Sequence, residues 1–440
     1  MIMLSFLLAI IIGTLLLMLP ISSSSGNFTP LPDALFTSTT SICVTGLVVV
    51  PTFSYWSFFG QAVILVLIQI GGLGVITVMA ALALFLHKKM GLSGRILLQD
   101  SFNLNTMSGL TSFLKRVVIG TFVIEALGAL LYMTVFIPQF GAKGIWISVF
   151  NSISAFCNAG LDVIGNNSLC SYATHPLINA VTCILIVLGG LGYIVWWDVM
   201  RVIKERKNMG GKLWSRLTLH SKIVLLSTAT LIFTGAILFL IFEYNNPLTM
   251  GKMTLYDKIQ AAFFQSVTTR TAGFATVPQE ALTSSSSALS LLLMFIGGSP
   301  VGTAGGVKTV TFVVIIAAAV SAIRGKNDTA LLNRTISKPQ ISRALGVVFM
   351  SFTIMFLSTL ALSATTDASF VDIMFETVSA TATVGLSRAL TPLLNTAGKL
   401  IITVTMYLGR VGPISLAFAF NVKRQNQNAI KDPIEEVSIG

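Results

Sequence analysis

Four short stretches of similar pattern recur along the 440-residue chain, each between apolar runs of membrane-spanning length. Each opens with phenylalanine, continues through small and hydroxyl-bearing residues, and reaches a glycine ten residues later. They are FTSTTSICVTGL from Phe36, FNSISAFCNAGL from Phe150, FFQSVTTRTAGF from Phe263 and FETVSATATVGL from Phe375. The glycines are 114, 113 and 112 residues apart, at Gly46, Gly160, Gly273 and Gly385. A fixed period of this length indicates an internal fourfold repeat.

The composition places the chain in a lipid bilayer. It is 54% hydrophobic and only 10% charged, and apolar runs of about 20 residues, the length of a transmembrane helix, recur up to Lys423. We expect no appended catalytic or regulatory domain. The first run, 1–20, has no positive leader and no small-residue cleavage site, so we interpret it as a retained helix rather than a signal peptide.

Each repeat has the order apolar helix, short semi-polar segment, apolar helix. The segment has about 11 residues, half of what a crossing needs, so it can enter the membrane and return but cannot span it. We therefore predict an all-α polytopic membrane protein with four parallel helix–pore loop–helix repeats around a pseudo-fourfold central pore. The predicted repeats cover 1–86, 112–200, 221–323 and 342–421, followed by a tail over 422–440. Their second helices are expected over 59–86, 178–200, 287–323 and 396–421.

The net charge of +12 is distributed unevenly. Of 28 Lys and Arg residues, 20 fall in clusters between and after the repeats, at 88–116, 201–222, 324–343 and 423–431. This positive-inside pattern predicts a multi-pass protein of the cytoplasmic membrane with both termini cytoplasmic and its basic loops next to membrane lipids. The same distribution argues against nucleic acid as a partner. Every pore loop then enters from outside.

The repeated glycines suggest an ion filter. A cation enters a membrane only where oxygen ligands replace its hydration water, and a ring of backbone carbonyls does this. Turning carbonyls toward an axis requires dihedrals, often with positive φ, that glycine reaches without strain. Asp33, Asp257 and Asp372 lie near the starts of three pore helices, where capping is the simpler role and attraction of cations the alternative. The candidate ion-binding residues, called the filter loops below, are Cys43, Val44, Thr45, Gly46, Cys157, Asn158, Ala159, Gly160, Arg270, Thr271, Ala272, Gly273, Ala382, Thr383, Val384 and Gly385.

The second helix of the third repeat is interrupted by GGSPVGTAGGVKT. Its glycines and proline cannot remain a regular helix, so we predict an intramembrane gate loop over 297–306, a movable constriction below the filter. A phosphate-binding loop is excluded because Val307 stands where that motif needs glycine. GGLG at 189–192 is expected to serve helix packing. The candidate gate residues are Gly297, Gly298, Ser299, Pro300, Gly302, Thr303, Gly305, Gly306, Lys308 and Arg410.

Two arginines fall within apolar or pore-like segments. Arg410 lies inside an apolar run, where a charge is costly and is a functional candidate by default. It could hold the fourth repeat to the gate loop, or form an electrostatic barrier that the ion must pass, and the two roles are compatible. Arg270 is expected to point away from the pore and to brace its filter loop against a neighbour such as Glu376.

TTRTAGF and TATVGL, with their paired glycines, resemble the pore loops of the Trk/Ktr/HKT superfamily of potassium transporters. The likeness covers essentially the whole chain, and the start at the first helix of repeat one favours the Ktr-type (KtrB-like) membrane subunit. The resemblance implies potassium uptake, an arginine below the filter that influences permeation, and K⁺ at Gly46, Gly160, Gly273 and Gly385. It also implies a homodimer, with which the tail is consistent, on a cytoplasmic ring of nucleotide-binding (RCK/KTN-type) regulatory subunits.

Two other classes of function compete with this interpretation. A membrane enzyme would need a nucleophile, a base or a metal cluster, but the three histidines are scattered and the four cysteines fit no metal site. No enzyme and no covalently bound cofactor are therefore expected. An ion-coupled transporter would use buried acids, for which Glu125 and Glu376 are candidates. Sodium permeability and Na⁺ dependence stay open, and potassium is favoured because glycine at the first filter position goes with potassium in the resembled family.

Overall fold

A computed structural model describes residues 2–75, 77–78, 80, 110–209, 213–326 and 328–412. The predicted tail, the end of the fourth repeat and most of the first basic cluster lie outside these residues. The described chain is mostly helical, with one antiparallel two-stranded hairpin, which confirms the fold class. By length and composition, α7, α12 and α16 can each cross a membrane, and α9 with α10 forms a bent fourth candidate.

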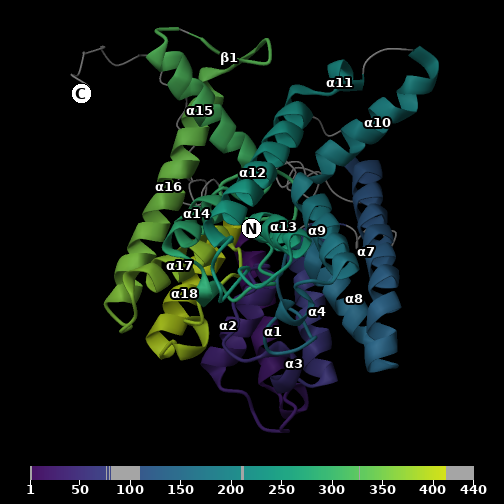
Figure 1. Ribbon diagram of the computed structural model, residues 1–440, viewed down its shortest axis with the longest axis vertical. Coiled ribbons are helices and arrows are strands. Elements are labelled where there is room, and N and C mark those ends of the chain that lie inside the picture. The colour runs from purple at the N-terminus through teal and green to yellow at the C-terminus, as the bar shows by residue number, and fades with distance from the viewer. Residues whose placement is uncertain are drawn as a thin grey trace.

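The helices follow the chain in four groups, each with a short helix that leads into a filter loop (Figure 1). The first group contains α1 (Ile2–Met18), α2 (Leu31–Ile42), α3 (Thr52–Tyr55) and α4 (Phe58–Leu73). The second contains α7 (Leu110–Phe140), α8 (Lys143–Cys157), α9 (Pro176–Leu191) and α10 (Tyr193–Met209), and α11 (Leu213–Arg216) follows it. The third contains α12 (Leu219–Glu243), α13 (Leu255–Thr268), α14 (Ser284–Phe295) and α15 (Thr309–Ile323), and the hairpin of β1 (Thr329–Leu331) and β2 (Arg334–Ile336) follows. The fourth contains α16 (Lys338–Ser363), α17 (Phe370–Ala382) and α18 (Thr396–Val411). We call α2, α8, α13 and α17 the pore helices.

Side chains set the starts of two pore helices. Thr254 Oγ1 accepts the N–H of Asp257 at 3.3 Å, and Ser369 Oγ accepts the N–H of Asp372 at 3.2 Å. Both aspartates, like Asp33 in α2, lie in the first turn, where a carboxylate favours the positive end of the helix dipole. The capping side chains are therefore Thr254 and Ser369 rather than the aspartates, and α2 has no side-chain cap among the described residues.

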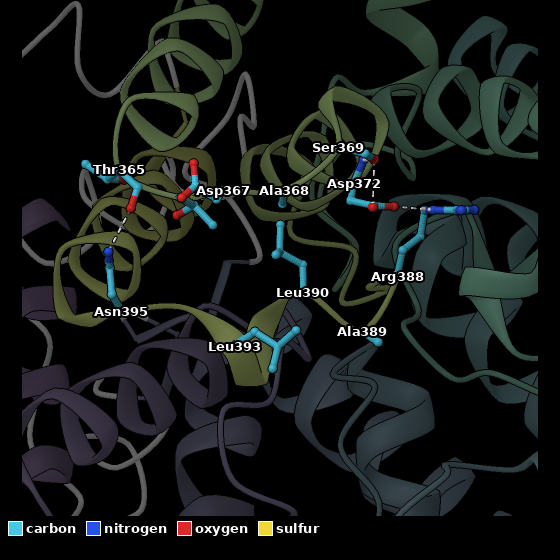
Figure 2. Close-up of a pocket in the computed structure, with 11 residues that line it drawn as sticks. Thr365, Asp367, Ala368, Ser369, Asp372, Arg388, Ala389, Leu390, Leu393 and Asn395 are labelled. Carbon is cyan, nitrogen blue, oxygen red and sulfur yellow. Dashed lines mark hydrogen bonds and ion pairs between the residues drawn. The ribbon is translucent and has the colours of Figure 1, made fainter.

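Two ion pairs lie beside the pore helices, and each takes part in a contact between groups. Lys399 Nζ lies 2.6 Å from Asp33 Oδ1, which links α18 to α2. Arg388 Nε lies 2.7 Å from Asp372 Oδ1 of the same group (Figure 2). Arg388 Nη1 also donates to the carbonyl of Gln279 at 3.0 Å, which joins the fourth group to the third. Asp372 and Arg388 face an open cavity of about 420 Å³ beside the start of α17.

The surroundings of Asp372 keep this second ion pair charged. Burial raises the pKa of Asp372, but the hydrogen bond from Ser369 and the interactions with Arg388 outweigh it, so the pKa lies below its ordinary value. A lowered folded pKa means that the stabilisation is fully present above the ordinary Asp pKa of about 4 and is lost as the pH falls through the folded value. The ion pair is therefore intact at neutral pH.

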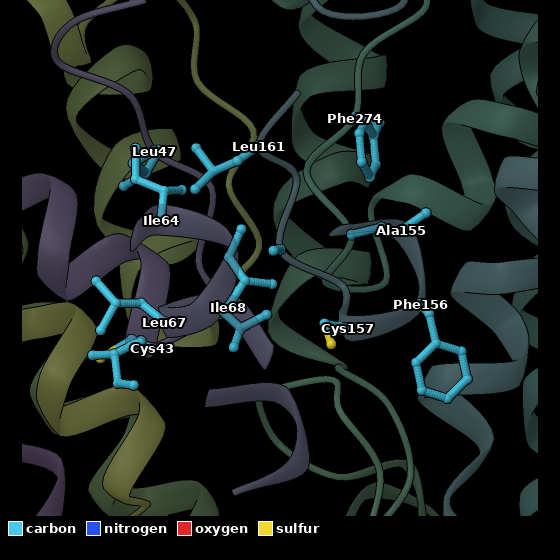
Figure 3. Packing of buried hydrophobic residues seen from close by; sticks show 14 of the residues in the cluster. Cys43, Leu47, Ile64, Leu67, Ile68, Ala155, Phe156, Cys157, Leu161 and Phe274 are labelled. Carbon is cyan, nitrogen blue, oxygen red and sulfur yellow. The ribbon is translucent and has the colours of Figure 1, made fainter. Parts of the chain in front are cut away.

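The pattern of burial is reversed relative to a soluble protein. Phe349 and Phe356 of α16 are 74% and 56% exposed on the outside of the bundle, as lipid-facing residues are. In α2, the hydroxyl residues at 38–41 are at most 1% exposed. Apolar side chains, such as Ile68 of α4 and Phe156 of α8, pack around the ends of the pore helices and hold them in place (Figure 3).

The second helix of the second group is broken. α9 and α10 meet at an angle of 95° at Gly192, whose φ is 86°. At the break, the N–H of Tyr193 donates to the carbonyl of Val301 in the third group, at 3.0 Å. The single helix expected over 178–200 is therefore two helices, because a contact between groups replaces the helical hydrogen bond there.

Candidate ion-conduction site

The glycines of the four filter loops form a closed ring. A Cβ atom built on each glycine would collide with the backbone carbonyl of the residue before the next glycine. The contacts are Gly46 to Ala159 (2.5 Å), Gly160 to Ala272 (2.7 Å), Gly273 to Val384 (2.7 Å) and Gly385 to Thr45. Because this cycle returns to its start, the four loops surround one axis in chain order. We call these four residues the glycine ring.

The backbone adopts the same unusual conformation in all four loops. The ring glycines have φ of 98°, 67°, 83° and 98°, a region that residues with a Cβ reach only with strain. The residue two positions before each glycine is also left-handed, with φ of 55° at Val44, 60° at Asn158, 65° at Thr271 and 51° at Thr383. Four dissimilar sequences thus build one backbone shape, and the sequence prediction of positive φ is correct at every ring glycine.

All 16 residues of the filter loops are buried. The hydroxyl groups of Thr45, Thr271 and Thr383 have no hydrogen-bond partner among the described residues. Unpaired buried oxygens are unusual and indicate a polar ligand or water. These three hydroxyl groups lie on the same loops as the ring carbonyls. Hydroxyl and carbonyl oxygens are therefore gathered around the glycine ring, and no ion pair involving a carboxylate lies on these loops among the described residues.

Hydroxyl groups of the pore helices hold each filter loop from behind. Thr40 Oγ1 accepts the N–H of Gly46 at 2.9 Å, and Ser379 Oγ accepts the N–H of Gly385 at 3.0 Å. In the other two repeats, Ser154 and Thr268 donate their hydroxyls to the carbonyl of the residue after the ring glycine, both at 2.5 Å. The sequence interpretation missed these four residues, which we call the brace hydroxyls. Their signal is a serine or threonine five or six positions before each glycine.

The candidate gate loop lies between α14 and α15 and is bound to the second group. The N–H of Ser299 donates to the carbonyl of Gly190 at 2.9 Å, and the N–H of Thr303 donates to that of Gly189 at 3.1 Å. The hydroxyl of Thr303 reaches the carbonyl of Phe156, next to a filter loop, at 3.1 Å. The GGLG motif at 189–192 therefore receives the gate loop in addition to the helix packing expected of it, since a Cβ built on Gly189 of α9 would also collide with the carbonyl of Phe156 in α8. Glycine is needed because two backbones touch there.

Basic side chains bind the same loop from the other side. Arg410 Nη1 donates to the carbonyl of Thr303 at 2.7 Å, and its Nη2 donates to the carbonyl of Gly71 in α4. Lys308 Nζ donates to the carbonyl of Ala304. Arg410 thus joins three groups through backbone oxygens. The remaining candidate gate residues all lie in the described loop: Gly297, Gly298, Pro300, Gly302, Gly305 and Gly306.

Arg270 does point away from the glycine ring, but its expected partner is wrong. Its Nη2 donates to the carbonyl of Gly297, at the start of the gate loop, at 3.3 Å. Glu376 instead accepts hydrogen bonds from Ser387 and Thr391 within its own repeat. Arg270 is near the gate loop because the end of α14, where that loop begins, lies beside the filter loop that contains Arg270. The sequence around Arg270 does not predict this contact.

The other buried acid, Glu125, lies behind the second filter loop. Its carboxylate accepts a hydrogen bond from Gln69 at 3.2 Å, and Cys157 Sγ lies 3.8 Å away. It is 4% exposed and belongs to the wall that supports Cys157. Within the described residues, no group of three His, Cys, Asp or Glu side chains could hold a metal ion, and the four cysteines are free thiols.

Comparison with known proteins assigns the family. Residues 2–431 match the sequence model of the TrkH family, described as cation transport proteins. The chain belongs to this TrkH family. Ktr system potassium uptake protein B of Bacillus subtilis (strain 168) is 41% identical over 438 residues, which cover 99% of this chain and 95% of the relative. Potassium/sodium uptake protein NtpJ of Enterococcus hirae is 39% identical over 441 residues, which cover 99% and 95%.

The TrkH fold is also seen in a solved structure. The potassium transporter TrkH from Vibrio parahaemolyticus superposes with a TM-score of 0.72, at 15% identity, over 94% of this chain and 84% of that one. The resemblance drawn from the glycine loops is thereby confirmed, and the ring and the candidate gate loop described above lie inside a TrkH-family membrane transporter.

We predict that the brace hydroxyls set how well the pore distinguishes ions. Thr40→Val and Ser379→Ala each leave a buried glycine N–H without a partner, which costs about 1–3 kcal/mol and loosens the ring. The potassium to sodium flux ratio of reconstituted protein should fall by roughly fivefold or more, since about 1.4 kcal/mol corresponds to tenfold.

Thr134→Val is the matched control, because Thr134 is exposed on α7 and bonds only within its own helix. An unchanged flux ratio in both brace variants would contradict a role for these hydroxyls in the ring.

Proposed function

We propose that this chain takes up potassium across the cytoplasmic membrane through a channel-like pore, with the glycine ring as its selectivity filter. The single observation that carries the proposal is the cyclic contact of four glycine backbones, each against the carbonyl that precedes the next glycine. A ring of carbonyls can replace the hydration shell of a bare alkali cation. The names of the relatives, which include a potassium uptake protein of the Ktr system, agree with this ion.

A sodium-permeable or ion-coupled transporter of the same architecture is the second candidate. Its support is the relative NtpJ, named a potassium/sodium uptake protein, at 39% identity. The surroundings of Glu125 argue against proton coupling through this acid, because the side chain hydrogen-bonds within the wall behind a filter loop. Potassium is therefore the transported ion in our proposal, and Na⁺ is the alternative that the name of NtpJ supports.

In this proposal the loop over 297–306 is the gate. Arg410 and Lys308 hold it below the ring by hydrogen bonds to its carbonyls, and their positive charges raise the electrostatic barrier for a cation. Opening then requires the loop to break its hydrogen bonds to Gly189 and Gly190 of the second group and to Arg410 of the fourth group. Because all these contacts are to backbone, small rearrangements of the surrounding helices can release them together.

We further propose a homodimer controlled by a cytoplasmic ring of nucleotide-binding (RCK/KTN-type) subunits. Its support is the basic charge of the described residues within 201–222 and 324–343, which lie on α10, α11, the hairpin and the adjoining ends of α12, α15 and α16, at the end of the molecule opposite α3 (Figure 1). An open pore would let potassium run down the membrane potential, at about 2.3 kcal/mol per charge per 100 mV, so regulation is expected. With these basic segments in the cytoplasm, both termini are cytoplasmic as well.

The experiment that tests the filter is substitution of single ring glycines by serine. Gly46→Ser, Gly160→Ser, Gly273→Ser and Gly385→Ser each place a Cβ against a neighbouring carbonyl at positive φ. The strain of about 1–2 kcal/mol or more should lower the potassium to sodium flux ratio about tenfold or more in proteoliposomes.

Gly346→Ser on α16 is the matched control, because no atom lies within 4 Å of a Cβ built there. If all four ring variants kept the parental ion preference while folding normally, the ring would not be the filter.

We predict that disturbing the gate loop changes the rate of uptake and not the preference among ions. In Gly302→Ala, the new Cβ would lie 2.9 Å from the carbonyl of Gly189, which pushes the loop off the second group. Loss of one or two hydrogen bonds, at about 1 kcal/mol each, should raise potassium flux roughly five- to thirtyfold. Gly346→Ala is the control, and a variant with unchanged flux would refute the gate assignment.

A further inference from the structure

Arg270 is an unusual buried charge. It lies three residues before Gly273, it is 7% exposed, and it makes no ion pair among the described residues. One guanidinium nitrogen, Nη2, donates to the carbonyl of Gly297. Its Nε has no hydrogen-bond partner among the described residues, although the atom is fully enclosed. A buried donor of a charged group without a partner is expensive, so something absent from the chain itself is expected to bind it.

The structure contains a space of suitable size at this point. A cavity of about 20 Å³ lies between α9, α12, the end of α13 and the start of the gate loop, and Arg270 lines it. Thr228 of α12 lines the same cavity, and its Oγ1 is also buried without a partner. The other walls are mainly apolar, among them Ile186, Ile232 and Val267. A single water needs roughly 10–15 Å³ and two to four polar partners, so the cavity fits one.

We propose that this cavity binds one ordered water molecule that joins Arg270 Nε to Thr228 Oγ1, and that Arg270 held in this way is a positioning residue between filter and gate. The role between filter and gate rests on the proposed function. The water accepts from Nε and exchanges a hydrogen bond with the threonine hydroxyl. With Nη2 on Gly297 and Nε on the water, the guanidinium plane is fixed at two points.

The position of Arg270 gives this arrangement a consequence for transport. The residue belongs to a filter loop, while Gly297 is the first residue of the gate loop, directly after the end of α14. Movement of the gate loop at Gly297 therefore pulls on the third filter loop through one side chain. Thr228 and its water anchor that side chain to α12, an element that belongs to neither loop. Filter and gate are then coupled through a defined contact rather than acting independently.

Thr228→Val removes the hydroxyl while keeping the side-chain shape, so it tests the water without opening a hole. Thr230→Val is the matched control, since Thr230 lies two residues on in the same helix and is exposed. An experimental structure that resolves waters should contain density between Arg270 Nε and Thr228 Oγ1 in the parent and in Thr230→Val, and none in Thr228→Val. Density that persists in Thr228→Val, or an anomalous bromide peak in the cavity, would overturn the water assignment.

The transport arm uses potassium flux and the potassium to sodium ratio in proteoliposomes. Thr228→Val should change flux about tenfold or more, as expected for loss of one hydrogen bond to a charged group, and Thr230→Val should not. Arg270→Lys keeps the charge but cannot contact Gly297 and the water at once, so it should give a similar change. In the double variant the two effects should not add, because both act through one network.

Additive effects, or a Thr228→Val variant that behaves like Thr230→Val, would overturn the positioning role. These outcomes differ from a failure of the proposed function, which would appear as unchanged ion preference in the ring-glycine variants. The density measurement does not depend on transport, so it decides the water assignment whichever cation the protein conducts.

Discussion

The contact between each ring glycine and the carbonyl before the next glycine is the constraint on which the rest of the structure depends. It brings four backbones together inside a membrane, where no lipid atom can satisfy their polar groups. The pore helices are short because they must end at this ring. Their hydroxyls are buried because they hold the loops that form it, and the long helices α7, α12 and α16 expose apolar side chains because they separate the ring from lipid.

Charge inside the membrane follows a consistent rule in the described residues. Arg270, Lys308 and Arg410 all donate to backbone carbonyls of the gate loop. A carboxylate partner in the same place would neutralise the charge and offer a competing site for a permeating cation. Carbonyl partners instead hold the loop while leaving the positive charge in place, which suits a barrier below a cation filter. The buried acid Glu376 accepts hydrogen bonds from two hydroxyls of its own repeat, and the buried acid Glu125 accepts one from Gln69 of the first group.

The sequence predicts those parts of the site whose chemistry repeats. Gly46 and its three equivalents were identifiable because only glycine suits the close backbone approach, and this requirement recurs at one period in the chain. The brace hydroxyls recur at the same period. Serine and threonine are also common in helices that have no such role, so their spacing alone does not identify these residues. The partner of Arg270 lies in the same repeat but 27 residues further along the chain, and the role of Gly189 depends on a contact between repeats, more than 100 residues apart in sequence. The break at Gly192 has the same origin, because the carbonyl that accepts the N–H of Tyr193 belongs to another repeat.

The central claim is that the glycine ring binds the transported ion, and anomalous scattering from rubidium in crystals of the protein tests it most directly. Rubidium substitutes for potassium, has a usable absorption edge and can be located without a model of the filter. The account predicts a peak on the axis of the ring, within coordination distance of the carbonyls of Thr45, Ala159, Ala272 and Val384. The peak should weaken when sodium replaces rubidium and disappear in Gly273→Ser. Ordered rubidium elsewhere in the membrane region, with none at the ring, would contradict the account.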